Sequence, residues 1–165
     1  MERERDLMHE HLRTTRHHVL GTVTGLDDQA LRQPVLPTGW TCLSMLSHLT
    51  HDVENFWFRA VVAAEPRTVA HYERQPLAGW HVGTDADALA VIDGYRRACD
   101  AADAVIEVTS PTTSPRWWPA EQFGDWRLPD FRAVMLHVII ETATHAGHLD
   151  AARELLDGGT WLILE

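Results

Sequence analysis

Residues 137–148 contain three histidines and one glutamate at helical spacing: His137, Glu141, His145 and His148. On a helix these four positions fall within roughly 80° of one another, so their side chains share one face. Imidazole nitrogens and carboxylate oxygens are common protein ligands for divalent transition metals. The spacing therefore indicates a metal site built largely on one helix.

The apolar residues around these positions also repeat with helical spacing and define the face that should pack in the core. They are Phe131, Val134, Val138, Leu149, Ala152 and Leu156. Their stripe is centred about 60° from Glu141 and about 20° from His145. A charged carboxylate at the edge of a core is costly unless something pairs with it, and a bound cation would satisfy Glu141 and His145 together.

A metal that does chemistry needs about three protein ligands and an open position, so a third ligand must come from another helix. Residues 42–63 predict that helix, with Thr41 as its N-cap. Its apolar stripe is Cys42, Met45, Leu46, Leu49, Val53, Phe56 and Ala60. His48 and Asp52 flank this stripe, whereas His51 lies nearly opposite and is predicted to be on the surface.

We therefore predict His48, Glu141 and His145 as the metal ligands. Asp52, His137 and His148 are candidates for alternate ligands or for partners that orient the ligands. Two imidazoles and one carboxylate with a free position suit Zn²⁺, Ni²⁺ or Fe²⁺, and such a site can activate water or a thiolate. The alternative without a metal is a buried polar network in which Glu141 and His145 pair with Arg13, Arg16 or another helix.

The rest of the chain predicts an all-α fold, a four-helix bundle in one domain over residues 1–165. The other two helices are expected over residues 6–23, with His9, His11, His17 and His18 on a solvated or edge face, and over residues 84–108, capped by Thr84. The last helix opens at Pro129 and stops at Gly158. Long loops are expected over residues 64–84 and 109–128, and the apolar tail 160–165 should pack on the body or on a partner subunit.

Tryptophans 117, 118 and 126 in the second loop either cover a site or plug the open end of the bundle. The net charge of −10 argues against nucleic-acid binding and against an anionic membrane surface. There is no apolar run of membrane-spanning length and no signal-peptide pattern, and the two cysteines form no disulfide framework. A cytoplasmic protein with a small-molecule substrate is expected.

Two stretches resemble the DinB-like superfamily of metal-binding four-helix bundles. These are Gly39-Trp-Thr with the later Leu-Ser-His48-Leu-Thr-His-Asp52, and the segment from Leu136 to Asp150 that contains Glu-Thr-Ala-Thr-His-Ala-Gly-His. The resemblance covers nearly the whole chain. In that superfamily one histidine of the second helix and two residues at i, i+4 on the fourth helix bind the metal, which implies His48, Glu141 and His145 here.

The Glu-x3-His pair is similar to that of the mycothiol-dependent maleylpyruvate isomerase branch, although this chain has no length for the second domain of that isomerase. The resemblance implies a divalent-metal-dependent S-transferase or isomerase that uses a low-molecular-weight thiol such as mycothiol or bacillithiol. It also implies a homodimer. A hydrolase that activates water at the same metal, or a non-catalytic metal-binding stress-response module, is the alternative.

Overall fold

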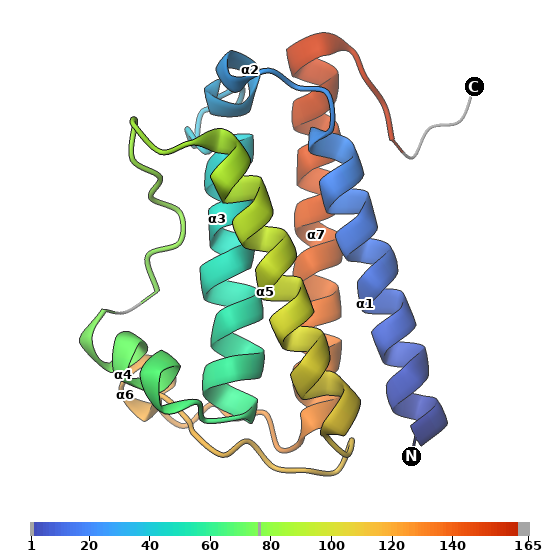
Figure 1. Cartoon of the computed structure of the whole chain (residues 1–165), viewed down its shortest axis with the longest axis vertical. Helices are drawn as coiled ribbons and strands as arrows, with labels where there is room; N and C mark the ends of the chain where they lie inside the picture. Colours follow the sequence, from blue (N-terminus) through green and yellow to red (C-terminus); the bar gives the residue numbers. More distant parts are fainter. Residues whose placement is uncertain (1, 76, 162–165) are drawn as a thin grey trace.

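The computed structural model describes residues 2–75 and 77–161, and the regular structure of these residues is entirely helical. Four long segments run side by side (Figure 1), which confirms the all-α prediction. They are α1 (Glu2–Val23), α3 continued by η1 (Cys42–His48 and Leu49–Val62), α5 (Ala88–Val108) and α7 (Phe131–Asp157). The short helices are α2 (Asp28–Arg32), α4 (Pro66–Arg74) and α6 (Ala120–Phe123). Within the described ranges, no helix combines the length and apolarity that a bilayer crossing requires.

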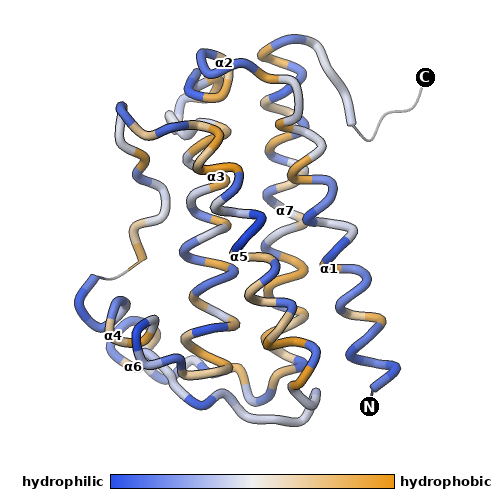
Figure 2. Tube along the Cα trace, in the orientation of Figure 1, coloured by the Kyte–Doolittle hydropathy of each residue, from blue (hydrophilic) through white to orange (hydrophobic). Residues whose placement is uncertain are grey.

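The core lies between the long segments, where α1 packs mainly on α7 and α5 packs mainly on η1. Apolar residues recur along each of these helices (Figure 2), and Leu12, Leu46 and Leu149 are completely buried. All seven residues of the stripe predicted over 42–63 are buried. Leu89, near the start of α5, is 69% exposed and lies outside this core. Hydrophobic burial thus determines which face of each ligand-bearing helix turns toward the core.

The helix predicted over residues 42–63 begins as expected and then changes type. The Thr41 side chain accepts a hydrogen bond from the backbone of Ser44, whose side chain accepts one from the backbone of Thr41, so the two form a capping box. From Leu49 onward the segment is π-helical, a wider winding that is rare and often found at functional sites. Its outward side chains recur every four residues, at His51, Asn55 and Arg59, and most of the others are buried.

Three helices begin at residues other than those predicted from the sequence. Residues 64–84 are not all loop, because Pro66 opens α4 at its first turn, where the missing N–H costs nothing. Asp87, and not Thr84, caps α5. Asp130 caps α7, so Pro129 precedes that helix, whereas Gly158 ends it in the left-handed conformation as predicted.

The predicted apolar tail is described only as far as Trp161, and residues 162–165 lie outside the described residues. The Trp161 ring stacks on His18 of α1, with ring centroids 6.2 Å apart and planes 15° apart. A Cβ on Gly21 would overlap this ring, so only a glycine lets the indole approach α1 this closely.

Candidate metal centre

The structure brings the three predicted ligands together where α3 meets η1 and faces the middle of α7. One ligand atom from each of His48, Glu141 and His145 lies within 4.8 Å of the other two. Glu141 Oε1 is 3.2 Å from His145 Nε2 and 3.6 Å from His48 Nε2. Glu141 and His145 come from successive turns of α7, so the helix itself sets their spacing. The site therefore joins two segments that are about ninety residues apart in sequence.

The orientation of His48 is fixed from behind by Asp52. His48 Nδ1 lies 3.0 Å from Asp52 Oδ2, and that carboxylate also accepts a hydrogen bond of 2.9 Å from the backbone N–H of Gly79. If Nδ1–H donates to Asp52, Nε2 keeps its lone pair and faces Glu141 and His145. A carboxylate behind a histidine is the usual arrangement for an imidazole that binds a metal.

The His48 Nε2 atom is buried and makes no hydrogen bond among the described residues, since 3.6 Å to Glu141 is too long for one. A buried polar atom without a partner is costly, and such atoms in native proteins often mark a ligand site. Two imidazole nitrogens and one carboxylate oxygen around the same small space match the donor set of Zn²⁺, Ni²⁺ or Fe²⁺. The residues present therefore fit a divalent cation.

The charges of the site favour a cation as well. Hydrogen bonding to His145, and then attraction to His48, holds the pKa of Glu141 well below its usual range. Burial alone would lower the pKa of His48, but the carboxylates of Asp52 and Glu141 outweigh burial and raise it. An ionised carboxylate thus stands between two imidazoles in a partly desolvated place, where it attracts positive charge.

An indole covers one side of this group. The Trp80 ring stacks on the His48 ring with centroids 4.2 Å apart and planes 16° apart, and it meets His145 edge-on at 5.6 Å. The side chain of Glu141 remains 35% exposed, so the group is open to solvent on the side of that carboxylate. A small molecule can therefore reach the space between the three side chains.

The structure separates the other predicted candidates. His148 lies beside the group, with its Nδ1 atom 3.4 Å from His145 Nδ1. His137 does not join the group. Its ring packs on Trp57 at 4.7 Å and on Trp126 at 5.7 Å, inside an aromatic cluster with Trp118. That cluster includes Phe123 of α6, and α6 lies at one end of the long helices (Figure 1). Of the two interpretations of the tryptophan-rich loop, packing at the end of the helices therefore fits the structure better.

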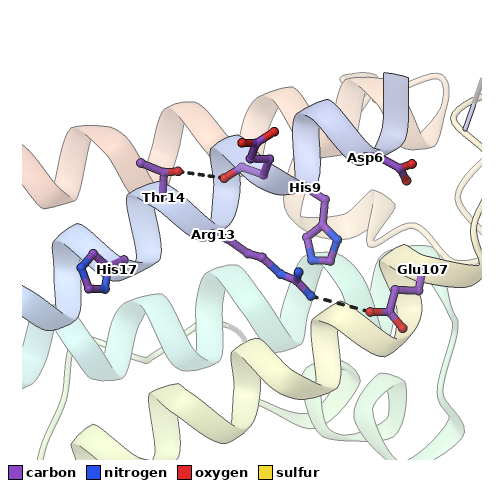
Figure 3. Close-up of a pocket in the computed structure, with 7 residues that line it drawn as sticks. Asp6, His9, Arg13, Thr14, His17 and Glu107 are labelled. Atoms are coloured by element: carbon purple, nitrogen blue, oxygen red, sulfur yellow. Dashed lines mark hydrogen bonds and ion pairs between the residues drawn. The ribbon is translucent and has the colours of Figure 1, made fainter. Parts of the chain in front are cut away.

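The arginines of the alternative without a metal are engaged elsewhere. Arg16 pairs with Glu54 and Asp103, and Arg13 pairs with Asp103 and Glu107. Figure 3 shows Arg13 reaching Glu107 across the hollow between α1 and α5. The same view shows His9, which is buried and contacts Asp103, so of the solvated and edge positions allowed for this histidine it does not take the solvated one. Neither arginine provides a partner for Glu141.

Sequence reasoning missed Gly79 and Trp80, because both fall in a stretch predicted as plain loop. A Cβ on Gly79 would lie 2.8 Å from both Asp52 Oδ2 and the Cα atom of His48. The loop can therefore approach the helix only with glycine at this position, and the approach places Trp80 over His48. The Gly-Trp pair inside a loop was the only signal, and it is weak without the contact.

Replacing Gly79 with alanine is expected to push the loop off Asp52. Three atoms would lie under 3 Å from the new methyl group, one of them in the backbone, so the methyl group cannot be accommodated without a shift of the loop. We expect a loss of about 1–3 kcal/mol in the free energy of unfolding, as for other overpacked sites. Denaturant titration measures this loss.

Gly147 provides the matched control, because a Cβ there meets nothing within 4 Å. Since glycine within a helix is unfavourable, Gly147→Ala should be neutral or stabilising by up to about 1 kcal/mol. Equal stability of the two alanine variants would contradict the role given to Gly79.

Comparison with known proteins supplies the family. A protein-family model described as Mycothiol-S-transferase matches residues 7–158, which include most of α1 and the whole of α7. No curated protein and no solved structure matches the chain. The matched range also contains His48, Glu141, His145 and the loop that carries Trp80. The chain belongs to the Mycothiol-S-transferase family, within the DinB-like superfamily.

Proposed function

We propose that this protein is a divalent-metal-dependent mycothiol S-transferase, a four-helix bundle that acts in the cytoplasm. The observation that carries the proposal is the buried, unpartnered Nε2 atom of His48, which faces Glu141 and His145. Membership of the Mycothiol-S-transferase family supports the choice of thiol. The donor set supports Zn²⁺, Ni²⁺ or Fe²⁺, held by these three side chains.

The chain's own thiols are unsuited to the reaction, which supports a thiol supplied from outside. Burial raises the pKa of Cys42 to about 11, and burial together with the neighbouring Glu54 raises the pKa of Cys99 further. Both therefore stay protonated and poorly nucleophilic at neutral pH. A bound divalent cation, when present, would favour the thiolate form of the incoming thiol.

The protein residues have separate tasks in this scheme. Asp52 holds His48 in the tautomer whose Nε2 lone pair faces the site. Trp80 excludes water from one side of the His48 ring. The exposed side near Glu141 leaves room for a small electrophile to meet the sulfur.

The test is S-conjugation of mycothiol to monochlorobimane, in which a sulfur–carbon bond forms, the thiol proton goes to solvent and chloride leaves. Protein stripped with a chelator and then reloaded separately with Zn²⁺, Ni²⁺ or Fe²⁺ should accelerate the reaction in at least one form. The stripped protein should not. Equal rates with stripped and reloaded protein, or no acceleration by any form, would overturn the proposal.

We also propose that the protein is a homodimer. Leu136 and Ile140 on the outer face of α7 are 48% and 65% exposed, and large exposed apolar side chains close together are typical of interaction sites. Sedimentation equilibrium should give twice the mass of one chain. Replacing both residues with glutamate should give monomers, whereas the same change at exposed Leu89 and Val108 on α5 should not.

A further inference from the structure

A second hollow, which takes no part in the proposed reaction, lies at one end of the long helices. We call it the α4–α6 hollow, because α4, α6 and the segment that leads into α6 form its walls (Figure 1). Its volume is about 670 Å³, which is usual for a small-molecule site. It contains none of the candidate metal ligands, and it is lined by Tyr72, Glu73, Trp117, Trp118, Pro119, Ala120, Glu121 and Gln122.

The aromatic walls of the α4–α6 hollow are held against η1. The rings of Tyr72 and Trp117 both meet the ring of Phe56 edge-on, with centroids 5.1 Å and 6.2 Å from it. The Tyr72 hydroxyl donates a hydrogen bond to the backbone carbonyl of His51. The backbone N–H of Trp117 donates one to the carbonyl of Val61. Since Phe56 is completely buried, these walls are in place before a ligand arrives, and little ordering is needed on binding.

The charge at the α4–α6 hollow is negative. Among the described residues that line it, Glu73 and Glu121 are the only charged ones. Both are exposed, and neither makes an ion pair or a side-chain hydrogen bond within the part of the chain that the structure describes. Other exposed carboxylates, such as Asp28, Asp93 and Asp157, each pair with an arginine of their own helix. Two unpaired carboxylates beside a hollow favour a ligand of positive charge.

The aromatic side chains favour the same charge. The faces of indole and phenol rings attract cations, and indole does so best. Trp118 illustrates this, since the guanidinium of Arg127 lies 5.3 Å from its ring centroid. An ammonium group with alkyl substituents suits such walls, because its apolar groups pack on the rings while its charge is attracted by the rings and the carboxylates together.

We propose that the α4–α6 hollow binds a small molecule through an alkylated ammonium group. The inference goes beyond the proposed function and does not depend on it, because it involves neither the metal nor the thiol. A second ligand site on the same chain follows from it.

Choline and its uncharged isostere 3,3-dimethylbutan-1-ol are the paired probes, since they share a shape and differ in charge. Titration of the full-length chain is followed by ligand-observed NMR. We expect saturable binding of choline, about tenfold or more tighter than binding of the isostere. Raising the ionic strength from about 0.01 M to about 1 M should weaken choline binding and leave the isostere unaffected, because salt screens the exposed carboxylates.

Two sets of variants locate the site. Glu73→Gln with Glu121→Gln should weaken choline binding about threefold or more, because it removes both charges. Glu10→Gln with Glu154→Gln, which removes the same charge from exposed positions on α1 and α7, should not. Trp117→Leu should reduce the preference for choline over its isostere to about threefold, whereas Trp117→Phe, which keeps an aromatic face, should retain more of it.

The proposal is overturned if choline does not bind, or if the isostere binds as tightly as choline. It is also overturned if the Glu73–Glu121 and Trp117→Leu variants keep the parental preference, or if the Glu10–Glu154 control loses as much affinity as the Glu73–Glu121 variant. Phosphatidylcholine vesicles present the same ammonium group on a membrane. Protein that floats with these vesicles and is released by choline would overturn the small-molecule ligand in favour of a lipid headgroup.

Discussion

His48→Ala, Glu141→Gln and His145→Ala proteins, purified after growth with added metal, are expected to hold far less divalent metal than the parent. Each change removes one of three donors whose ligand atoms lie within 4.8 Å of one another. Loss of residues that only orient a ligand typically weakens metal binding about 10–100-fold, so loss of a ligand should weaken it by more than about a hundredfold. Metal content by mass spectrometry and affinity by chelator competition measure the effect.

Two histidines on the same helices serve as matched controls. His137 lies one turn before Glu141 but packs in the aromatic cluster, and His51 is exposed on η1. His137→Ala and His51→Ala should therefore bind metal as the parent does. Asp52→Asn should fall between the two groups, at about 10–100-fold weaker binding, because it perturbs the ring of His48 without removing a donor.

The metal assignment is contradicted if any one of the three ligand variants binds metal with parental affinity while remaining folded by circular dichroism. It is also contradicted if His137→Ala alone loses the metal. The second result would favour the alternate ligand that the sequence left open and that the structure places against Trp57.

The proximity of His48, Glu141 and His145 could be predicted from the sequence because helical periodicity is a strong local rule. Glu141 and His145 must share a face of α7, and His48 was the histidine of its helix that could turn toward the core. The family resemblance and the helical wheel selected the same three residues. α3 with its continuation η1 and α7 are both long segments, and they bring His48 close to Glu141 and His145.

Contacts made by loops, and contacts that depend on the π-helical winding of η1, could not be predicted from the sequence. Gly79 and Trp80 belong to a stretch whose pattern shows no period, so their approach to Asp52 and His48 could not be predicted. The buried Glu54 was missed for another reason. A wheel drawn at 3.6 residues per turn misplaces side chains where η1 winds as a π-helix, and η1 is also covered by α4, α5 and α7 together.

Glu54→Ala is expected to destabilise the fold more than Gly79→Ala does. Glu54 is fully buried and accepts two hydrogen bonds from Arg16, of 2.7 Å and 2.6 Å. Arg16 is 4% exposed, and its attraction to Glu54 outweighs burial and raises its pKa, so the guanidinium stays charged. Removing the carboxylate leaves that charge buried, with Asp103 as its remaining ion-pair partner among the described residues. Breaking a buried pair in this way costs about 3–5 kcal/mol, a large share of the stability of a typical domain.

A double variant separates two contributions to the free energy of unfolding: the net effect of the ion pair, and the cost of leaving one charge buried without its partner. Replacing both partners by apolar residues of similar size, Arg16→Met with Glu54→Leu, should destabilise less than Glu54→Ala alone, because no buried charge remains. Asp93→Ala, which breaks the exposed Asp93–Arg96 pair of α5, should stay within about 0.5 kcal/mol of the parent. Urea unfolding of the parent and the three variants measures these differences. A Glu54→Ala protein as stable as Asp93→Ala would contradict this prediction. It would mean that water or another side chain replaces Glu54 beside Arg16, and that the Arg16–Glu54 pair does not stabilise the packing of α1 on η1.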